Sequence, residues 1–253
     1  MTDRPNSSPR RHTRIAPLLS ILAAALTWVG PPVAQADDYN VLLVGNSFSK
    51  GIKRPLRDAL EADGSNATVK TRARPGWTLG KHAASRSTPK YIARPAWTDV
   101  FLQEQSDGID DSRYPDARAL DTLIALTGAR TGFMMTWRDR GAPPSDFNSL
   151  RGEIGGSVGY VPIAHELDAP LAPVGWAIRS ALDDGAGLDF WKPDGHHLNK
   201  TGTYLAALVL YAVMTNNSPV GLPYPRRHED DAPYLQALVE ETVFSESVIW
   251  NLP

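Results

Sequence analysis

The segment from Val41 to Gly64 constrains the fold more than any other part of the sequence. Residues 41–44 are all apolar, and this run stops at Gly45, which is followed by Asn-Ser-Phe-Ser at 46–49. A short continuous apolar run is typical of a strand buried on both faces, as in a parallel sheet. Residues 52–62 then carry apolar side chains at helical spacing until Gly64. The segment therefore predicts a buried strand, a tight turn and an amphipathic helix.

The rest of the chain repeats this alternation of strand and helix. Four further stretches have strand patterns, at 67–73, 100–102, 132–135 and 169–174. Helical patterns occur at 117–126, 163–167, 203–214 and 234–243, and a proline-rich loop occupies 216–225. Alternating strands and helices predict an α/β fold, here a three-layer α/β/α sandwich with a mostly parallel sheet of about five strands. No repeat or flexible linker divides the pattern, so we expect a single domain over 37–253.

The first 36 residues have the features of a signal peptide. Basic residues at 10–14 precede an apolar stretch at 15–29, and Ala34-Gln35-Ala36 offers a cleavage site that leaves Asp37 as the first mature residue. A retained membrane anchor is the alternative, but Gly30 and two prolines interrupt the apolar run. We therefore predict a secreted or periplasmic protein without stable membrane insertion after cleavage, exported by either the general or the twin-arginine route.

Charge and cysteine content exclude several classes of function. The chain has 26 basic and 28 acidic residues, a net charge of −2, and no basic block beyond its first residues. Such a balance argues against a nucleic-acid partner. The chain has no cysteine, which rules out a thiol nucleophile and cysteine metal sites. These features assign no oligomeric state.

Ser47 is the first candidate for a catalytic residue. It follows the predicted strand at 41–44 directly, and ligands of open α/β sheets bind at the carboxyl ends of the strands. A serine that opens a helix also has an unpaired amide N–H, which can bind a developing oxyanion. The alternative is that Ser47 only caps the helix, and the short stretch favours neither role, although Ser49 is the better cap of the two.

Asp194 and His197 are candidates for the acid and base that a serine nucleophile needs. They lie three positions apart just before the apolar helix at 203–214, so that on a turn the carboxylate can hold the imidazole. Two alternatives are a plain surface turn and a metal site made of Asp194, His196 and His197, with His82 as a further ligand. Adjacent histidines rarely converge on one ion, so together with Ser47 the triad is the favoured interpretation.

These blocks resemble the SGNH (GDSL-type) hydrolase superfamily. Gly-Asn-Ser-Phe-Ser at 45–49 and Asp-x-x-His at 194–197 are similar to its first and last blocks, and Arg-Pro-Gly-Trp-Thr-Leu at 74–79, with His82 behind it, resembles the second. The segments at 99–106 (DVFLQEQS), 172–175 (APVG) and 194–207 are similar to a poorly characterised bacterial branch. The resemblance covers 39 to about 218 and implies the flavodoxin-like SGNH fold.

The resemblance also implies the remaining site residues. Ser47 and Gly76 would supply amides to the oxyanion hole of a serine ester hydrolase that needs no cofactor and no metal. The chain departs from the family by having Asn46 where many relatives have aspartate, and by lacking Gly-x-Asn-Asp in the third block. A glutamine carries the same amide as the missing asparagine, so we expect Gln103, the closer to the strand end, or alternatively Gln105, to replace it. Both could also be plain polar residues.

The substrate prediction depends on three tryptophans. Trp77, Trp137 and Trp191 lie near strand ends or catalytic blocks, where indoles could stack on sugar rings, although packing is the simpler role of each. We therefore expect a small-molecule or carbohydrate ester, with short acyl groups such as acetyl on carbohydrate as the leading class. Two alternatives stay open: a non-catalytic glycan-binding or ligand-binding protein on the same scaffold, and a metal-dependent hydrolase that uses Asp194 and His196.

Overall fold

The computed structural model describes residues 1–2, 37–94 and 96–253. The predicted signal peptide at 1–36 lies outside these residues, apart from its first two positions, and stays a prediction. Within the described ranges, no helix is both long enough and apolar enough to cross a membrane.

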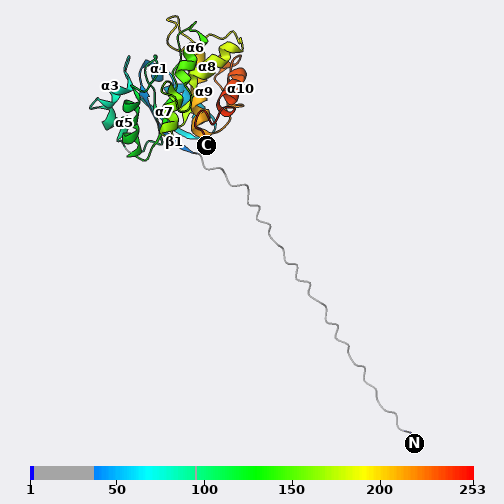
Figure 1. Ribbon diagram of the computed structural model, residues 1–253. Helices are drawn as coiled ribbons and strands as arrows, with labels where there is room; N and C mark the ends of the chain where they lie inside the picture. The colour runs from blue at the N-terminus through cyan, green and yellow to red at the C-terminus, as the bar shows by residue number, and fades with distance from the viewer. Residues whose placement is uncertain (3–36, 95) are drawn as a thin grey trace. The chain divides into compact units, whose positions relative to one another are not determined.

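Residues 37–94 and 96–253 form the predicted α/β fold around one parallel sheet (Figure 1). Within the described residues the sheet has five strands in the order β2-β1-β3-β4-β5, and every neighbouring pair runs parallel. The order reverses at β1 (Asp38–Gly45), which lies between β2 (Asn66–Ala73) and β3 (Asp99–Leu102). This is the flavodoxin-like order, and the predicted fold class is confirmed.

The other elements of the described chain follow in sequence, as α1 (Ser47–Lys50), α2 (Lys53–Ala62), α3 (Leu79–Ala83), α4 (Thr88–Ile92), α5 (Tyr114–Ala125), β4 (Arg130–Met134), α6 (Pro144–Arg151), α7 (Tyr160–Glu166), β5 (Leu171–Ala172), α8 (Val174–Asp183), α9 (Lys200–Thr215), the 3₁₀ helix η1 (Arg226–His228) and α10 (Ala232–Phe244).

The sheet separates two apolar layers. Val41 and Leu43 of β1 face a core that includes buried residues of α2, α8, α9 and α10, whereas Leu42 and Val44 face one formed with α3, α4, α5 and α7. Figure 1 shows α3 and α5 on one side of the molecule and α8, α9 and α10 on the other. Burying one such side chain contributes about 1.5–3 kcal/mol. The continuous apolar run of β1 is therefore explained by burial on both faces.

Several elements differ from the sequence expectation. The helix predicted over 52–62 begins at Lys53 and is preceded by a separate short helix, α1. The strand predicted over 169–174 is reduced to Leu171 and Ala172, because Pro170 and Pro173 bracket it and a proline has no amide for a strand ladder. Four helices, α3, α4, α6 and α8, were not expected from the pattern.

Candidate active site

Three blocks of candidate residues come from loops at the carboxyl edge of the sheet. β1, β2 and β3 end at Gly45, Ala73 and Leu102, and each is followed at once by a block that the sequence analysis singles out. Because these strands are parallel neighbours, the three loops leave the sheet at the same edge. This edge is also where the strand order reverses, which is the usual ligand site of such sheets.

Asn46, rather than a serine, caps the helix that carries Ser47. Its side-chain oxygen accepts a hydrogen bond from the Phe48 amide at 3.0 Å, and its backbone is extended. Ser49, which the sequence analysis favoured as the cap, is fully buried, and its hydroxyl donates to Gln103 Oε1 at 2.7 Å. That expectation is therefore wrong. Capping by Asn46 leaves Ser47 in the first turn of α1 without a capping role.

Gly45 is required by the close packing beneath Ser47. A Cβ added at this position would lie 2.6 Å from the hydroxyl oxygen of Ser49 and 2.9 Å from the amide carbon of Gln103. Both side chains are buried and hydrogen bonded to each other, so neither can move without breaking that bond. The glycine thus lets the backbone pass close to these groups before it turns into α1.

Ser47, His197 and Asp194 form a continuous chain of hydrogen bonds. The Ser47 hydroxyl lies 3.0 Å from His197 Nε2, and His197 Nδ1 lies 2.9 Å from Asp194 Oδ2. The carboxylate accepts, so Nδ1 carries the proton of a neutral ring, and Nε2 is left to accept from the serine. The structure therefore brings together the three residues expected to form a triad, although Ser47 and His197 are 150 positions apart in the chain.

Backbone amides hold the Asp194 carboxylate in its charged form. Asp194 Oδ1 accepts from the amides of His196 and His197, each at 3.0 Å. The bond from the His196 amide contributes most to holding the pKa of Asp194 well below its usual range. The bonds from the His197 amide and from its ring add to the effect. The group stays ionised through the neutral range and can stabilise an imidazolium on His197.

The turn from Asp194 to His197 is fixed by its neighbours. Gly195 has a positive φ of 67°, and the Lys192 amide donates to the carbonyl of His197 at 2.7 Å. An antiparallel bridge between Trp191 and Leu198 closes the loop. The turn leads directly into α9, whose cap Asn199 accepts from the Gly202 amide at 3.0 Å.

The other two histidines of the proposed metal site point elsewhere. His196 Nδ1 contacts Asp139 Oδ1 at 2.5 Å. His82 is buried, with Nε2 donating to the Gly45 carbonyl at 2.7 Å and Nδ1 lying 3.0 Å from the Thr88 hydroxyl, and burial lowers its pKa. The described residues contain no group of three or more His, Asp or Glu side chains arranged to hold a metal ion.

Gly76 lies in a tight turn after β2. The Trp77 amide donates to the Arg74 carbonyl at 3.1 Å, and Gly76 has a positive φ of 66°. Proline at the second position and a glycine with positive φ at the third are the signature of a type II turn. The internal bond of such a turn uses the amide of its fourth residue, so the Gly76 amide is left for another acceptor.

Gln103 is not at the pocket, contrary to the favoured expectation. Its amide donates to the Val44 carbonyl at 2.9 Å, which continues the β1–β3 ladder by one residue and directs the side chain into the protein. The side chain is 1% exposed; Oε1 accepts from the Asn46 amide and the Ser49 hydroxyl, and Nε2 donates to the Glu104 carbonyl. Both polar ends are therefore engaged, and the assignment of Gln103 to the oxyanion hole is wrong.

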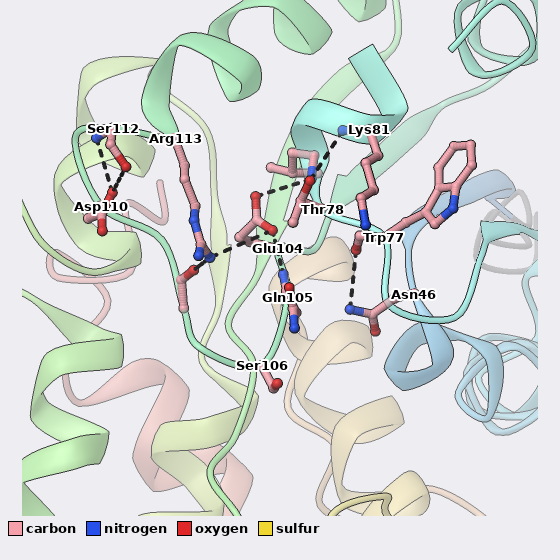
Figure 2. A network of polar contacts seen from close by, with 12 residues as sticks. Asn46, Trp77, Thr78, Lys81, Glu104, Gln105, Ser106, Asp110, Ser112 and Arg113 are labelled. Carbon is pink, nitrogen blue, oxygen red and sulfur yellow. Dashed lines mark hydrogen bonds and ion pairs between the residues drawn. The ribbon is translucent and has the colours of Figure 1, made fainter. Parts of the chain in front are cut away.

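Gln105 is the remaining glutamine of the third block. It lies in the loop beyond the ladder, and its side chain is half-buried. The backbone amide of Gln105 donates to Glu104 Oε1 at 2.6 Å, which fixes the backbone. The side-chain amide projects from the loop (Figure 2). Glu104 was not among the expected site residues, although it lies between the two glutamines in the third block.

The three tryptophans fall into two groups. Trp137 is 1% exposed, stacks on Phe48 at 4.1 Å between ring centroids and donates from Nε1 to the His196 carbonyl. Trp191 is 4% exposed and donates to the Arg138 carbonyl. Neither offers an open ring face for a sugar, so their expected stacking role is wrong. Trp77 is half-buried and keeps some exposed surface, with the Arg74 guanidinium 4.6 Å from its ring centroid.

A pocket of about 510 Å³ lies beside Ser47 and His197. Phe48 and Trp137, although almost fully buried, form part of its apolar wall, and Lys50 and Lys192 contribute positive charge. The two lysines were not expected at the site, because isolated lysines carry no local pattern that distinguishes a pocket from ordinary solvent-exposed surface.

No protein-family model matches the chain, and no curated protein matches it. Among solved structures, a DUF4886 family protein from Bacteroides uniformis is similar at 20% identity and a TM-score of 0.65, over 83% of this chain and 96% of that one. A proposed SGNH hydrolase from Slackia heliotrinireducens is similar at 26% identity and a TM-score of 0.54, over 71% of this chain and 100% of that one.

The psychrotrophic esterase EstA from Pseudoalteromonas sp. is also similar, at 16% identity and a TM-score of 0.51, over 70% of this chain and 96% of the esterase. Each of these three matches covers at least 70% of this chain and at least 96% of the other protein. The chain therefore has the SGNH hydrolase fold.

Proposed function

We propose that this protein is an exported serine ester hydrolase that works through an acyl-enzyme intermediate, with Ser47, His197 and Asp194 as its triad. The observation that carries the proposal is the hydrogen-bond chain from Ser47 Oγ through His197 to Asp194, at 3.0 Å and 2.9 Å. The same fold in a proposed SGNH hydrolase and in an esterase supports it.

In the first half-reaction, the Ser47 oxygen attacks the carbonyl carbon of the ester while its proton passes to His197 Nε2. A carbon–oxygen bond forms, and the carbonyl electrons move onto the oxygen. The imidazolium, stabilised by the Asp194 carboxylate, then gives its proton to the leaving alcohol oxygen. The bond to that oxygen breaks, the alcohol leaves, and Ser47 carries the acyl group.

In the second half-reaction, a water molecule attacks the acyl carbon and loses a proton to His197 Nε2. The bond to Ser47 Oγ breaks, His197 returns the proton to the serine, and the carboxylic acid leaves. Asp194 remains ionised throughout, because its two amide bonds hold its pKa low.

The developing oxyanion would be bound by the amides of Ser47 and Gly76 and by the side-chain amide of Gln105. Three features support this set: Ser47 is in the first turn of α1, the Gly76 amide is outside the bond that closes its turn, and the Gln105 side chain projects from the loop after β3. Each donor of this kind is worth roughly a hundred- to a thousand-fold in kcat.

We further propose that the substrate is a short acyl ester of a hydroxylated compound, with acetylated carbohydrate as the leading class. The pocket of about 510 Å³ beside Ser47 has room for a small acyl group and part of an alcohol. With Trp137 and Trp191 buried, Trp77 is the remaining indole that supports contact with a sugar ring.

The test is hydrolysis of a short-chain chromogenic ester by the mature protein from Asp37. Ser47→Ala should abolish turnover, whereas the matched control Ser145→Ala, in an exposed position on α6, should retain it. A chelator should have no effect. Loss of activity with the chelator would instead indicate a metal-dependent hydrolase.

Turnover that is equal in the native protein and in folded Ser47→Ala would contradict the enzyme proposal. It would favour the non-catalytic binding protein on the same scaffold, which glycan binding by the native protein would then test.

A further inference from the structure

Glu104 is a fully buried carboxylate that the proposed mechanism does not use. It lies one residue beyond Gln103, in the loop that follows β3, and its exposed fraction is 0%. Oε1 accepts from the Gln105 amide at 2.6 Å, and Oε2 accepts from the Leu79 amide at 3.1 Å. Figure 2 shows the carboxylate between Gln105 and the beginning of α3, next to Thr78.

These two bonds connect the two loops that carry proposed oxyanion donors. Leu79 is the first residue of α3, and only its cap Thr78 separates it from the turn that contains Gly76. Gln105 carries the proposed side-chain donor. One carboxylate group therefore fixes the spacing between the loop after β2 and the loop after β3. A further bond, from Asn46 Nδ2 to the Trp77 carbonyl at 3.4 Å, ties the first of these loops to the segment that precedes Ser47.

A buried carboxylate is an expensive way to hold two loops together. Burial raises the pKa of Glu104, and the two amide donors and Arg113, whose Nη1 lies 3.9 Å from Oε1, offset only part of that effect. Well-packed apolar side chains usually replace buried charges without loss of stability. Both carboxylate oxygens nevertheless face N–H donors, which suits the ionised form. The charge is therefore better explained by the directed bonds that it makes than by packing.

We propose that Glu104 is a positioning residue that holds Gln105, relative to the Gly76 turn, where its side-chain amide binds the oxyanion. The proposal rests on the proposed ester hydrolysis. Glu104 touches no reacting atom and acts through Gln105.

Glu104→Gln tests this role with a side chain of the same shape. The variant replaces one acceptor oxygen with an NH₂ group, which must face an N–H of Leu79 or of Gln105. One bond is lost, and the loop that carries Gln105 shifts. We expect kcat to fall by at least tenfold, and by no more than the roughly hundred- to thousand-fold value of one oxyanion donor, while KM changes less than twofold.

A double-mutant cycle separates positioning from general damage. If Glu104 acts through Gln105, then Glu104→Gln should lower kcat at least tenfold in the native background but less than threefold in Gln105→Ala. Tyr160→Phe is the matched control, since the Tyr160 hydroxyl accepts from the Glu104 amide at 3.1 Å and is not hydrogen bonded to the Leu79 or Gln105 amide. The variant removes a hydrogen bond from the same loop, so it should lower the free energy of unfolding, measured with urea, while kcat changes much less.

Two outcomes would overturn the proposal: native kcat in Glu104→Gln, or the same fold-loss in both backgrounds. If Glu104→Gln is not recovered folded, Glu104→Asp is the second variant. It keeps the charge but is one methylene too short to reach both amides, and the same cycle applies to it. Failure of the proposed function is seen separately, because Ser47→Ala would then equal the native protein.

Discussion

The two glutamines of the third block should separate catalysis from stability when each is replaced by alanine. Gln105 is half-buried in a loop, so its truncation should change the free energy of unfolding by less than about 0.5 kcal/mol, as is usual for surface positions. The loss of one oxyanion donor should nevertheless lower kcat by about a hundred- to a thousand-fold, or about 2.7–4 kcal/mol of transition-state stabilisation, with little change in KM.

Gln103→Ala should show the opposite pattern. Its Oε1 accepts from the Asn46 amide at 3.1 Å and from the Ser49 hydroxyl at 2.7 Å, and both donors are buried. Each donor left without a partner costs about 1–3 kcal/mol, so the free energy of unfolding should fall by about 2–6 kcal/mol. The fraction that remains folded should keep a kcat much closer to the native value.

The assay is kcat and KM on a short-chain chromogenic ester at a temperature where both variants are folded, beside urea unfolding of the same samples. The reasoning is refuted if Gln105→Ala stays within threefold of the native kcat while folded Gln103→Ala loses a hundredfold or more. Equal losses of kcat in two equally stable variants would also refute it.

Two further predictions concern stability. Burial is the main effect that lowers the pKa of His82 in the folded protein below its usual 6.5, and Arg72 and Arg74 lower it further. At a pH between the pKa of the folded state and that of the unfolded state, the unfolded state therefore binds more protons. The free energy of unfolding should therefore fall as the pH is lowered through about 6.5, and urea unfolding should show a flatter pH dependence in His82→Gln; an equal slope would contradict this. Gly175→Ala in α8 should lower the free energy of unfolding by about 3 kcal/mol, because the new Cβ would overlap the Thr136 carbonyl. In most helices the same change raises the free energy of unfolding by about 1 kcal/mol. An unchanged or raised Tm would contradict this prediction.

The parts of the site that the sequence predicted are those with a local signature. The apolar run at 41–44 ends where the buried strand ends, so Ser47 had to follow the sheet edge. Asp194 and His197 are close in the chain, and their spacing alone allows the turn that joins them. The structure places all three within one hydrogen-bond chain.

Features that depend on contacts between distant segments were missed. Gln103 was expected at the pocket because the strand pattern stops at Leu102, but its amide still pairs with Val44, and this pairing points the side chain inward. The burial of Trp137 could not be predicted from the sequence either, because Phe48, which stacks on one face of its ring, comes from a much earlier segment. The helices α3 and α4 have five residues each, which is too short to show a helical period.

The anchoring of the turn before α9 implies that the proposed base and the proposed oxyanion donors lie on segments of different stiffness. His197 is tied by backbone bonds to a loop that leads into α9, the helix with the most buried residues among those described. The Gly76 turn is exposed, and Gln105 is half-buried on a loop. Any adjustment to acyl groups of different size should therefore fall on these two loops, which Glu104 ties to each other, while the base keeps its place. Tolerance toward substrates and precision of proton transfer would then reside in different segments of the chain.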